Sequence, residues 1–171
     1  MSAEIDILIL MGSDSDWEVM RETGKLLDDF AVTYEARVSS AHRTPERTLE
    51  LVRNAENRGC KVIIAGAGAA AHLAGVVAGH TLLPVIGIPL NATSLQGLDA
   101  LLATVQMPAG IPVASMAIGK AGAANAAIFA LQIIATANPK IAEQLANYRQ
   151  EMTTKVENKD QRLQELQSAQ E

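Results

Sequence analysis

The chain has 171 residues, the length of a single domain, and a formal net charge of −5. Hydrophobic residues make up 49% of it but aromatic residues only 3%, so small aliphatic side chains must form the core. It has no basic cluster, which argues against a nucleic-acid partner. Between Val62 and Gly119 only Asp99 is formally charged. Polar residues and prolines interrupt this stretch too often for a membrane span, so we expect it to be buried against other subunits.

The start of the chain, residues 1–6, contains acidic side chains and leads directly into an apolar segment. It lacks the basic region and the long apolar region of a secretory signal peptide. Cys60 is the only cysteine, so no disulfide can form within the chain. These features predict a cytoplasmic protein.

Apolar segments of strand length alternate with helical patterns along the chain. The expected order is strand 5–11, helix 17–29, strand 32–39, helix 45–58, strand 61–65, helix 69–81, strand 84–89, helix 96–105, strand 111–118, helix 121–136 and a last helix from Pro139 towards Gln167. Asp16 and Thr44 are placed to cap the first two helices. The alternation predicts a three-layer α/β/α domain with a central parallel sheet.

The last two helices differ sharply in composition. The helix at 121–136 has no charge on any face, and we expect it to pack against other subunits. Residues 139–171 form a C-terminal helix and polar tail of the same domain as residues 1–138. An apolar stripe at helical spacing runs along that tail, and it is expected to pack on its own or a neighbouring subunit: Ile141, Leu145, Tyr148, Met152 and Val156.

Ligands of open parallel sheets bind outside the carboxyl ends of the strands, so the segments after the strands are the candidate sites. The first is Gly12-Ser13-Asp14-Ser15-Asp16. Its backbone amides and serine hydroxyls could hold a phosphate and Asp16 could bind sugar hydroxyls, or these residues could only cap the helix. The Asp-Ser-Asp spacing also resembles the nucleophile loop of haloacid-dehalogenase-like phosphohydrolases. The later acidic residues that such a magnesium site requires are missing.

The second segment follows the strand at 32–39 and contains Ser40, His42 and Arg43, directly before Thr44 and Pro45. Arginine can grip a phosphate with two parallel hydrogen bonds. Histidine can transfer protons near neutral pH. The two side chains together, on the ligand side of the sheet, favour a functional role for His42 over a structural one.

The third segment runs from Gly66 through Gly68 and Ala69 to His72 and has the form G-x-G-x-x-A. A dinucleotide fold is disfavoured, because the motif follows the third strand and no acidic residue lies about 20 residues further on. The small residues instead permit close approach of backbone and ligand. His72 could line the site or be structural, and His80 is taken as structural. Three scattered histidines and one cysteine predict no metal site.

Five motifs in order resemble class I N5-carboxyaminoimidazole ribonucleotide mutase, the purE-type enzyme of purine biosynthesis. They span residues 11–17, 40–45, 64–68, 105–113 and 122–127. The resemblance implies a flavodoxin-like subunit, a homo-octamer and a reaction that moves a carboxylate from the exocyclic nitrogen of the aminoimidazole to C4. It also implies that Ser13, Asp16 and Arg43 bind the ribonucleotide and that His42 is the general acid/base.

Under this interpretation the substrate-binding residues are Gly12, Ser13, Asp16, Ser40, Arg43, Gly68, Ala69 and His72. The enzyme would use neither metal nor cofactor. Retention of the released CO₂ requires a dry pocket, which we expect Gly68, Ala69, Ala70 and residues 94–97 to enclose. Alanine replaces a glycine common in the family at Ala69 and a proline at Ala74. Two alternatives stay open: a carboxylase that uses free CO₂, and a non-catalytic phosphate- or nucleotide-binding module.

Overall fold

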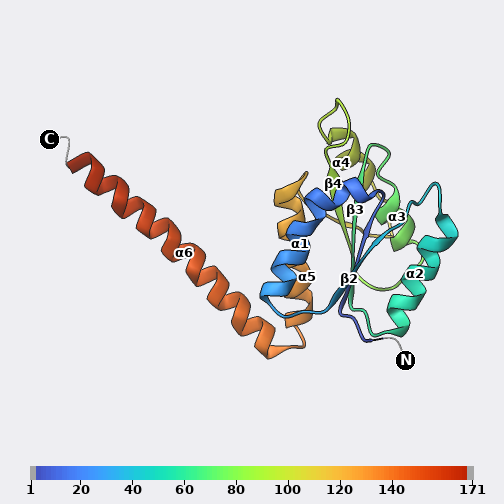
Figure 1. Ribbon diagram of the computed structural model, residues 1–171, viewed down its shortest axis with the longest axis horizontal. Coiled ribbons are helices and arrows are strands. Elements are labelled where there is room, and N and C mark those ends of the chain that lie inside the picture. The colour runs from blue at the N-terminus through green and yellow to red at the C-terminus, as the bar shows by residue number, and fades with distance from the viewer. Residues whose placement is uncertain (1–2, 169–171) are drawn as a thin grey trace.

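The computed structural model describes residues 3–168 as a five-stranded parallel sheet with helices on both faces (Figure 1). The elements are β1 (Ile7–Met11), the 3-10 helix η1 (Asp14–Asp16), α1 (Trp17–Asp29), β2 (Tyr34–Val38), α2 (Pro45–Asn57), β3 (Val62–Gly68), α3 (Leu73–Ala78), β4 (Val85–Leu90), α4 (Leu98–Val105), β5 (Ala114–Ser115), α5 (Lys120–Ala135) and α6 (Pro139–Ser168). This is the three-layer α/β/α architecture that the alternating pattern predicted.

The order of the strands determines where a ligand can bind. They lie in the order β2-β1-β3-β4-β5, and every neighbouring pair is parallel. The chain goes outward from β1 to β2 and then returns past β1 to β3, so the direction of winding reverses at β1. In flavodoxin-like sheets of this order, ligands bind at the carboxyl ends of the strands that flank the reversal. That edge of the sheet is the upper one in Figure 1.

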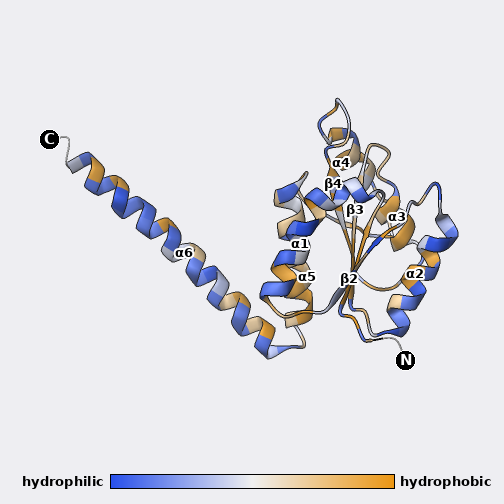
Figure 2. Ribbon diagram, in the orientation of Figure 1, coloured by the Kyte–Doolittle hydropathy of each residue, from blue (hydrophilic) through white to orange (hydrophobic). Residues whose placement is uncertain are grey.

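Side chains of β1 alternate between two hydrophobic cores. Ile7, Ile9 and Met11 pack with α1 and α5 on one face of the sheet, whereas Leu8 and Leu10 pack with α2 and α3 on the other. The strand therefore reads as a continuous apolar run, as expected when both faces of a parallel sheet are covered. In Figure 2 the hydrophobic colouring accordingly concentrates on the strands and on α5.

Helix α5, which carries no charge after Lys120, buries one face within its own subunit. It packs along α1, where the hydroxyl of Thr23 donates to the carbonyl oxygen of Ala123 at 2.8 Å. Burial within the subunit therefore accounts for the lack of charge on that face, and no contact with another subunit is needed to explain it. Phe129, on the remaining surface, is 37% exposed. The buried residues of the helix are Gly122, Ala123, Ala126, Ala127, Ala130, Leu131 and Ile134.

Two predicted elements are shorter in the structure. The helix expected at 69–81 spans only Leu73–Ala78, because β3 continues to Gly68 and Ala69, with a φ of +53°, turns the chain before the helix begins. The strand expected at 111–118 pairs with β4 only at Ala114–Ser115. It follows Gly110, which has a φ of +97°, and Pro112, which has no amide to donate to a neighbouring strand.

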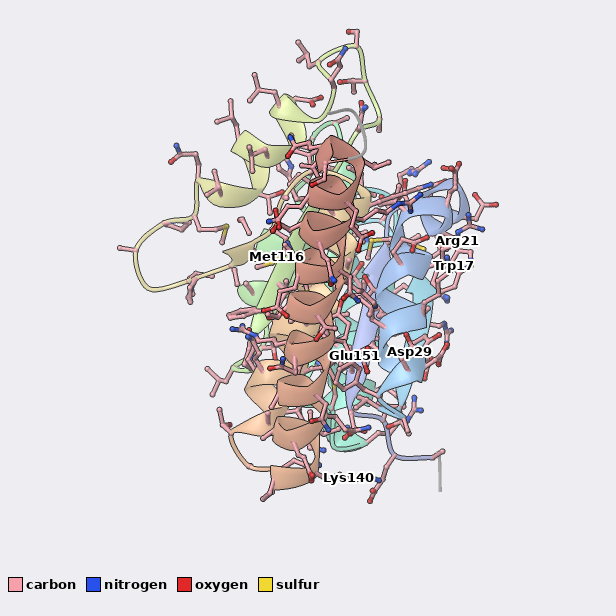
Figure 3. The ribbon with its side chains drawn as sticks, turned by 90° about the vertical axis from the view of Figure 1, so that its left-hand side faces the viewer. Trp17, Arg21, Asp29, Met116, Lys140 and Glu151 are labelled. Carbon is pink, nitrogen blue, oxygen red and sulfur yellow. The ribbon has the colours of Figure 1, made fainter. Side chains whose placement is uncertain are left out.

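Helix α6 begins on the body of the subunit and then projects away from it (Figure 1). Ile141 and Leu145 are buried, and the ring of Tyr148 meets Phe30 edge to face at 5.9 Å. Met152 and Val156, the last two residues of the predicted stripe, are 51% and 65% exposed. Figure 3 looks onto this side of the molecule, with Lys140 near the start of the helix and Glu151 further along it. Within residues 3–168, no helix has both the length and the apolar composition that a membrane crossing requires.

Glu35 on β2 forms ion pairs with Arg37 and Arg58. The hydrogen bond from Arg58 lowers the pKa of Glu35 and outweighs burial, which raises it. Because folding lowers this pKa, the pair stabilises the fold above the unfolded-state pKa, and its contribution disappears as the pH falls through the folded-state pKa. We expect Glu35→Gln to lower the free energy of unfolding by about 1 kcal/mol at pH 7 and by less at pH 3, as measured by urea unfolding. Equal losses at both pH values would contradict this role.

Candidate active site

Three loops meet at the carboxyl ends of β1, β2 and β3 and enclose a cleft of about 460 Å³. Eight of the nine predicted site residues line it; the exception is His72. The cleft lies where the winding of the sheet reverses, so the strand order brings these loops together. The lining residues are Gly12, Ser13, Ser15, Asp16, Ser40, Ala41, His42, Arg43, Ala67, Gly68, Ala69, Ala70, Leu73 and Ala92.

The loop after β1 is held by hydrogen bonds among its own residues. The amide of Ser13 donates to Asp16 Oδ2 at 3.0 Å, and the amide of Ser15 donates to Ser13 Oγ at 3.3 Å. These two contacts form a capping box around η1, which precedes α1. The prediction that Asp16 caps α1 is therefore wrong, since its side chain makes no capping bond to that helix. The carboxylate instead fixes the serine loop that faces the cleft.

Burial raises the pKa of Asp16, hydrogen bonds from the backbone oppose this effect, and the negative charge of Asp14 adds to it. The carboxylate is therefore partly withdrawn from water at the wall of the cleft. A group in this position can accept hydrogen bonds from hydroxyls of a ligand. Within residues 3–168, no three His, Cys, Asp or Glu side chains are grouped so that they could hold a metal ion.

The loop after β2 is folded around Thr44. The Thr44 hydroxyl donates to the carbonyl of Ser40 at 3.1 Å and accepts from the amide of Ser40 at 3.0 Å. Thr44 therefore closes the loop and does not cap α2 with its side chain, contrary to prediction, whereas Pro45 occupies the first turn as expected. The amide of Arg43 donates to Ser40 Oγ, and its guanidinium reaches across to the carbonyl of Gly12 at 3.4 Å. The second loop is thereby joined to the first.

The end of β3 supplies the floor of the cleft. A Cβ atom on Gly68 would lie 2.4 Å from the Cβ of Ala92, so only glycine permits this approach of β3 to the segment after β4. Gly66 is required for a different reason, since a Cβ there would overlap the side chain of Met20. Ala92 lines the cleft, but residues 94–97, which were predicted to wall it, do not. Leu95 in that segment is instead 60% exposed.

The side chains of His42 and His72 contact each other. His42 Nε2 lies 2.8 Å from His72 Nδ1, and the ring planes meet at 68° with centroids 4.9 Å apart. One ring must donate a hydrogen bond to the other, so a single proton lies between the two nitrogens and the tautomer of one ring determines that of its neighbour. His72 therefore contacts His42 but does not itself line the cleft. Sequence analysis singled out both histidines but not this contact, which joins residues 30 positions apart.

Comparison with known proteins shows to which family this chain belongs. A family model described as AIR carboxylase matches residues 6–155, which is most of the chain. The chain belongs to the AIR carboxylase family. The match covers all three loops of the cleft and both histidines, so the candidate site lies within the part of the chain that defines the family.

Members of the AIR carboxylase family resemble this chain in sequence and in fold. An N5-carboxyaminoimidazole ribonucleotide mutase from Pyrococcus horikoshii is 54% identical over 92% of this chain and 88% of its own length. The mutase of that name from Pyrococcus abyssi is 58% identical over 84% of this chain and 82% of its own. The crystal structure of Treponema denticola PurE has a TM-score of 0.83 and 29% identity, and the similarity covers 92% of this chain and 97% of that one. The resemblance to N5-carboxyaminoimidazole ribonucleotide mutases is confirmed.

This member of the AIR carboxylase family carries alanine at position 69, where the motif comparison expects glycine. Ala69 has a φ of +53°, a conformation that glycine adopts at no steric cost and that an L-residue adopts at a cost of roughly 1–2 kcal/mol. The common glycine is thus explained by the turn between β3 and the segment that leads to His72. Ala69 therefore stores some backbone strain at the edge of the cleft.

Proposed function

We propose that this protein is an N5-carboxyaminoimidazole ribonucleotide mutase that uses His42 as its general acid and base. The observation that carries the proposal is the placement of His42 on the cleft beside Arg43, opposite the Ser13 and Asp16 loop. This set combines one group that can transfer protons with groups that bind phosphate and sugar hydroxyls. The two Pyrococcus relatives that bear the mutase name support the choice of reaction.

The proposed reaction has two steps and no net proton change. His42 as an imidazolium protonates the carbamate nitrogen, so that the C–N bond breaks and leaves CO₂ and a neutral amine. The electron-rich ring then attacks the CO₂ through C4 and forms the new C–C bond. Neutral His42 removes the C4 proton as the ring regains aromaticity, and this restores the imidazolium.

The loops around His42 provide the substrate contacts that this sequence of steps needs. The hydroxyls of Ser13 and Ser40 and the guanidinium of Arg43 are donors for the phosphate, and Asp16 accepts from ribose hydroxyls. Gly68 and Ala69 form an apolar floor beside them, on which CO₂ can stay while the ring turns its C4 towards it. The hydrogen bond between His42 and His72 limits the orientations of the His42 ring.

The fate of the carboxylate carbon tests this function. Substrate that carries ¹³C only in its carboxylate is incubated with unlabelled bicarbonate. A mutase transfers the ¹³C to C4 of the product, at a rate that does not depend on the bicarbonate concentration. A carboxylase that uses free CO₂ would instead give product with unlabelled carbon, in proportion to the bicarbonate added. Absence of product in all conditions would favour a non-catalytic binding module.

We further propose that the subunits assemble into a homo-oligomer, and specifically an octamer, in part through α6. Met152, Val156, Leu163 and Leu166 on this helix are each more than half exposed, which is unfavourable for a helix in water. A second apolar surface lies at the loop between α3 and β4, where Leu82 is fully exposed next to a hollow of about 440 Å³.

Light scattering tests this assembly. The wild type is expected to have the mass of eight 18.1 kDa subunits, and Val156→Glu is expected to give smaller species, because a charge replaces an apolar contact. Thr154→Glu introduces the same charge two residues away, on a face of the helix outside the apolar stripe, and serves as the control. A wild type that scatters as an 18.1 kDa monomer would exclude the proposal.

A further inference from the structure

A second hollow lies directly behind Arg43, outside the cleft. It has a volume of about 310 Å³ and shares Gly12, Ser40 and Arg43 with the cleft, so these residues form a partition between the two spaces. The far side of the hollow is formed by the end of β2 and the first turn of α2. Its complete lining is Gly12, Val38, Ser39, Ser40, Arg43, Thr44 and Arg47.

Arg47 reaches this hollow from the first turn of α2. Its Nε donates to the carbonyl of Val38, the last residue of β2, at 3.4 Å. Arg43 is held in a similar way, by the carbonyl of Gly12 just after β1. The two guanidinium groups are thus anchored on the ends of two adjacent strands. With Nε engaged by the backbone, the two terminal amino groups of Arg47 remain available to a ligand.

Arg47 also borders a hollow that Glu35 and Glu50 line, but among residues 3–168 neither of the two arginines forms an ion pair. Arg37 and Arg58 instead share Glu35. Ser40 adds a hydroxyl whose oxygen accepts from the Arg43 amide, which leaves its hydrogen free to donate. Two guanidinium groups and a hydroxyl around one hollow are a donor set suited to a phosphate dianion.

We propose that Arg47 is a further substrate-binding residue, which holds the phosphate of the ribonucleotide together with Arg43. The proposal rests on the function proposed above. The base and ribose occupy the cleft beside His42 and Asp16, and the phosphate lies at the partition, with Ser13 on its cleft side and Arg47 on the side of α2. Arg43 is the charged residue that both spaces share, so it contacts the phosphate together with Arg47.

Substitution of Arg47 tests this assignment in the intact enzyme. Arg47→Gln is expected to raise KM for the ribonucleotide roughly 10- to 100-fold and to change kcat by less than about threefold, because a charge-assisted contact far from the reacting atoms is lost. Arg53→Gln removes the same charge from the exposed surface of the same helix and is expected to change KM by less than about twofold. Thermal unfolding of both variants checks that the fold is retained.

Direct binding separates this proposal from the proposed reaction. By calorimetry, the wild type is expected to bind ribose 5-phosphate more tightly than ribose, and Arg47→Gln is expected to lose most of that preference. An unchanged KM in Arg47→Gln, or an unchanged preference for the phosphorylated sugar, would overturn the role of Arg47. If the wild type shows no mutase turnover, the proposed reaction fails, and the comparison of ribose 5-phosphate with ribose still decides whether Arg47 binds phosphate.

Discussion

Replacement of His42 by asparagine is expected to lower kcat by about 10²–10⁴-fold or more, because asparagine cannot give and accept a proton at the carbamate nitrogen and at C4. Substrate affinity should change little, since Ser13, Asp16 and Arg43 remain on the wall of the cleft. Steady-state turnover measures the first effect, and calorimetric binding of ribose 5-phosphate measures the second. Loss of both would indicate that the substitution disturbs the loop as a whole.

His80→Asn is the matched control for this prediction. His80 follows α3, donates from Nδ1 to the carbonyl of Val76, and does not line the cleft. Its replacement is expected to leave turnover within about twofold of the wild type, as for a surface substitution. Full turnover in His42→Asn would exclude the acid/base role of His42, because another group would then have to transfer the proton.

Gly122→Ala is expected to have the largest effect on stability. A Cβ atom on Gly122 would lie 1.7 Å from the carbonyl oxygen of Ala117 and 2.7 Å from its carbon. Both are backbone atoms, so the start of α5 must move away from residues 116–118 to admit one methyl group. Overpacking of this kind costs typically 1–3 kcal/mol and here should exceed roughly 3 kcal/mol, a large share of the stability of an ordinary domain. Urea unfolding at neutral pH measures the loss.

The control for this substitution is Gly79→Ala. Gly79 has helical backbone angles, and the nearest atom to its added Cβ would be the carbonyl oxygen of Val76 at an ordinary 3.6 Å. The free energy of unfolding should therefore stay within about 1 kcal/mol of the wild type or increase slightly, because alanine restricts the unfolded chain. A similar loss in both variants would show that the clash with Ala117 is not what Gly122 avoids.

Much of the fold and of the cleft could be predicted from the sequence. Buried strands such as β1 and β3 are nearly continuous apolar runs, and the alternation of strands and helices allows few topologies. Asp16, His42 and Arg43 lie in the segments that follow β1 and β2, and parallel strand ends share one edge of the sheet. Their convergence therefore follows from chain order, before any side-chain packing is known.

The features that sequence analysis missed depend on contacts between distant residues. Nothing local to His42 or His72 indicates that their rings lie 2.8 Å apart, because the contact depends on how two loops 30 residues apart approach each other. Helix α3 starts late because Ala69 adopts a positive φ, and alanine gives no sign of that in a sequence. Arg47 was not among the predicted site residues, because its contact with the carbonyl of Val38 depends on how α2 packs beside the end of β2.

The projection of α6 has a consequence for how the subunit acquires its final structure. Residues 149–168 are all exposed in their own subunit, and Met152, Val156, Leu163 and Leu166 are each more than half exposed. An isolated helix of about 20 residues is only marginally stable in water, because propagation barely offsets the cost of nucleation. In a free subunit this part of α6 is therefore expected to open and close independently of the sheet. Under the proposed assembly its amide protons become strongly protected only when a partner covers the stripe, and the last folding event would then depend on subunit concentration.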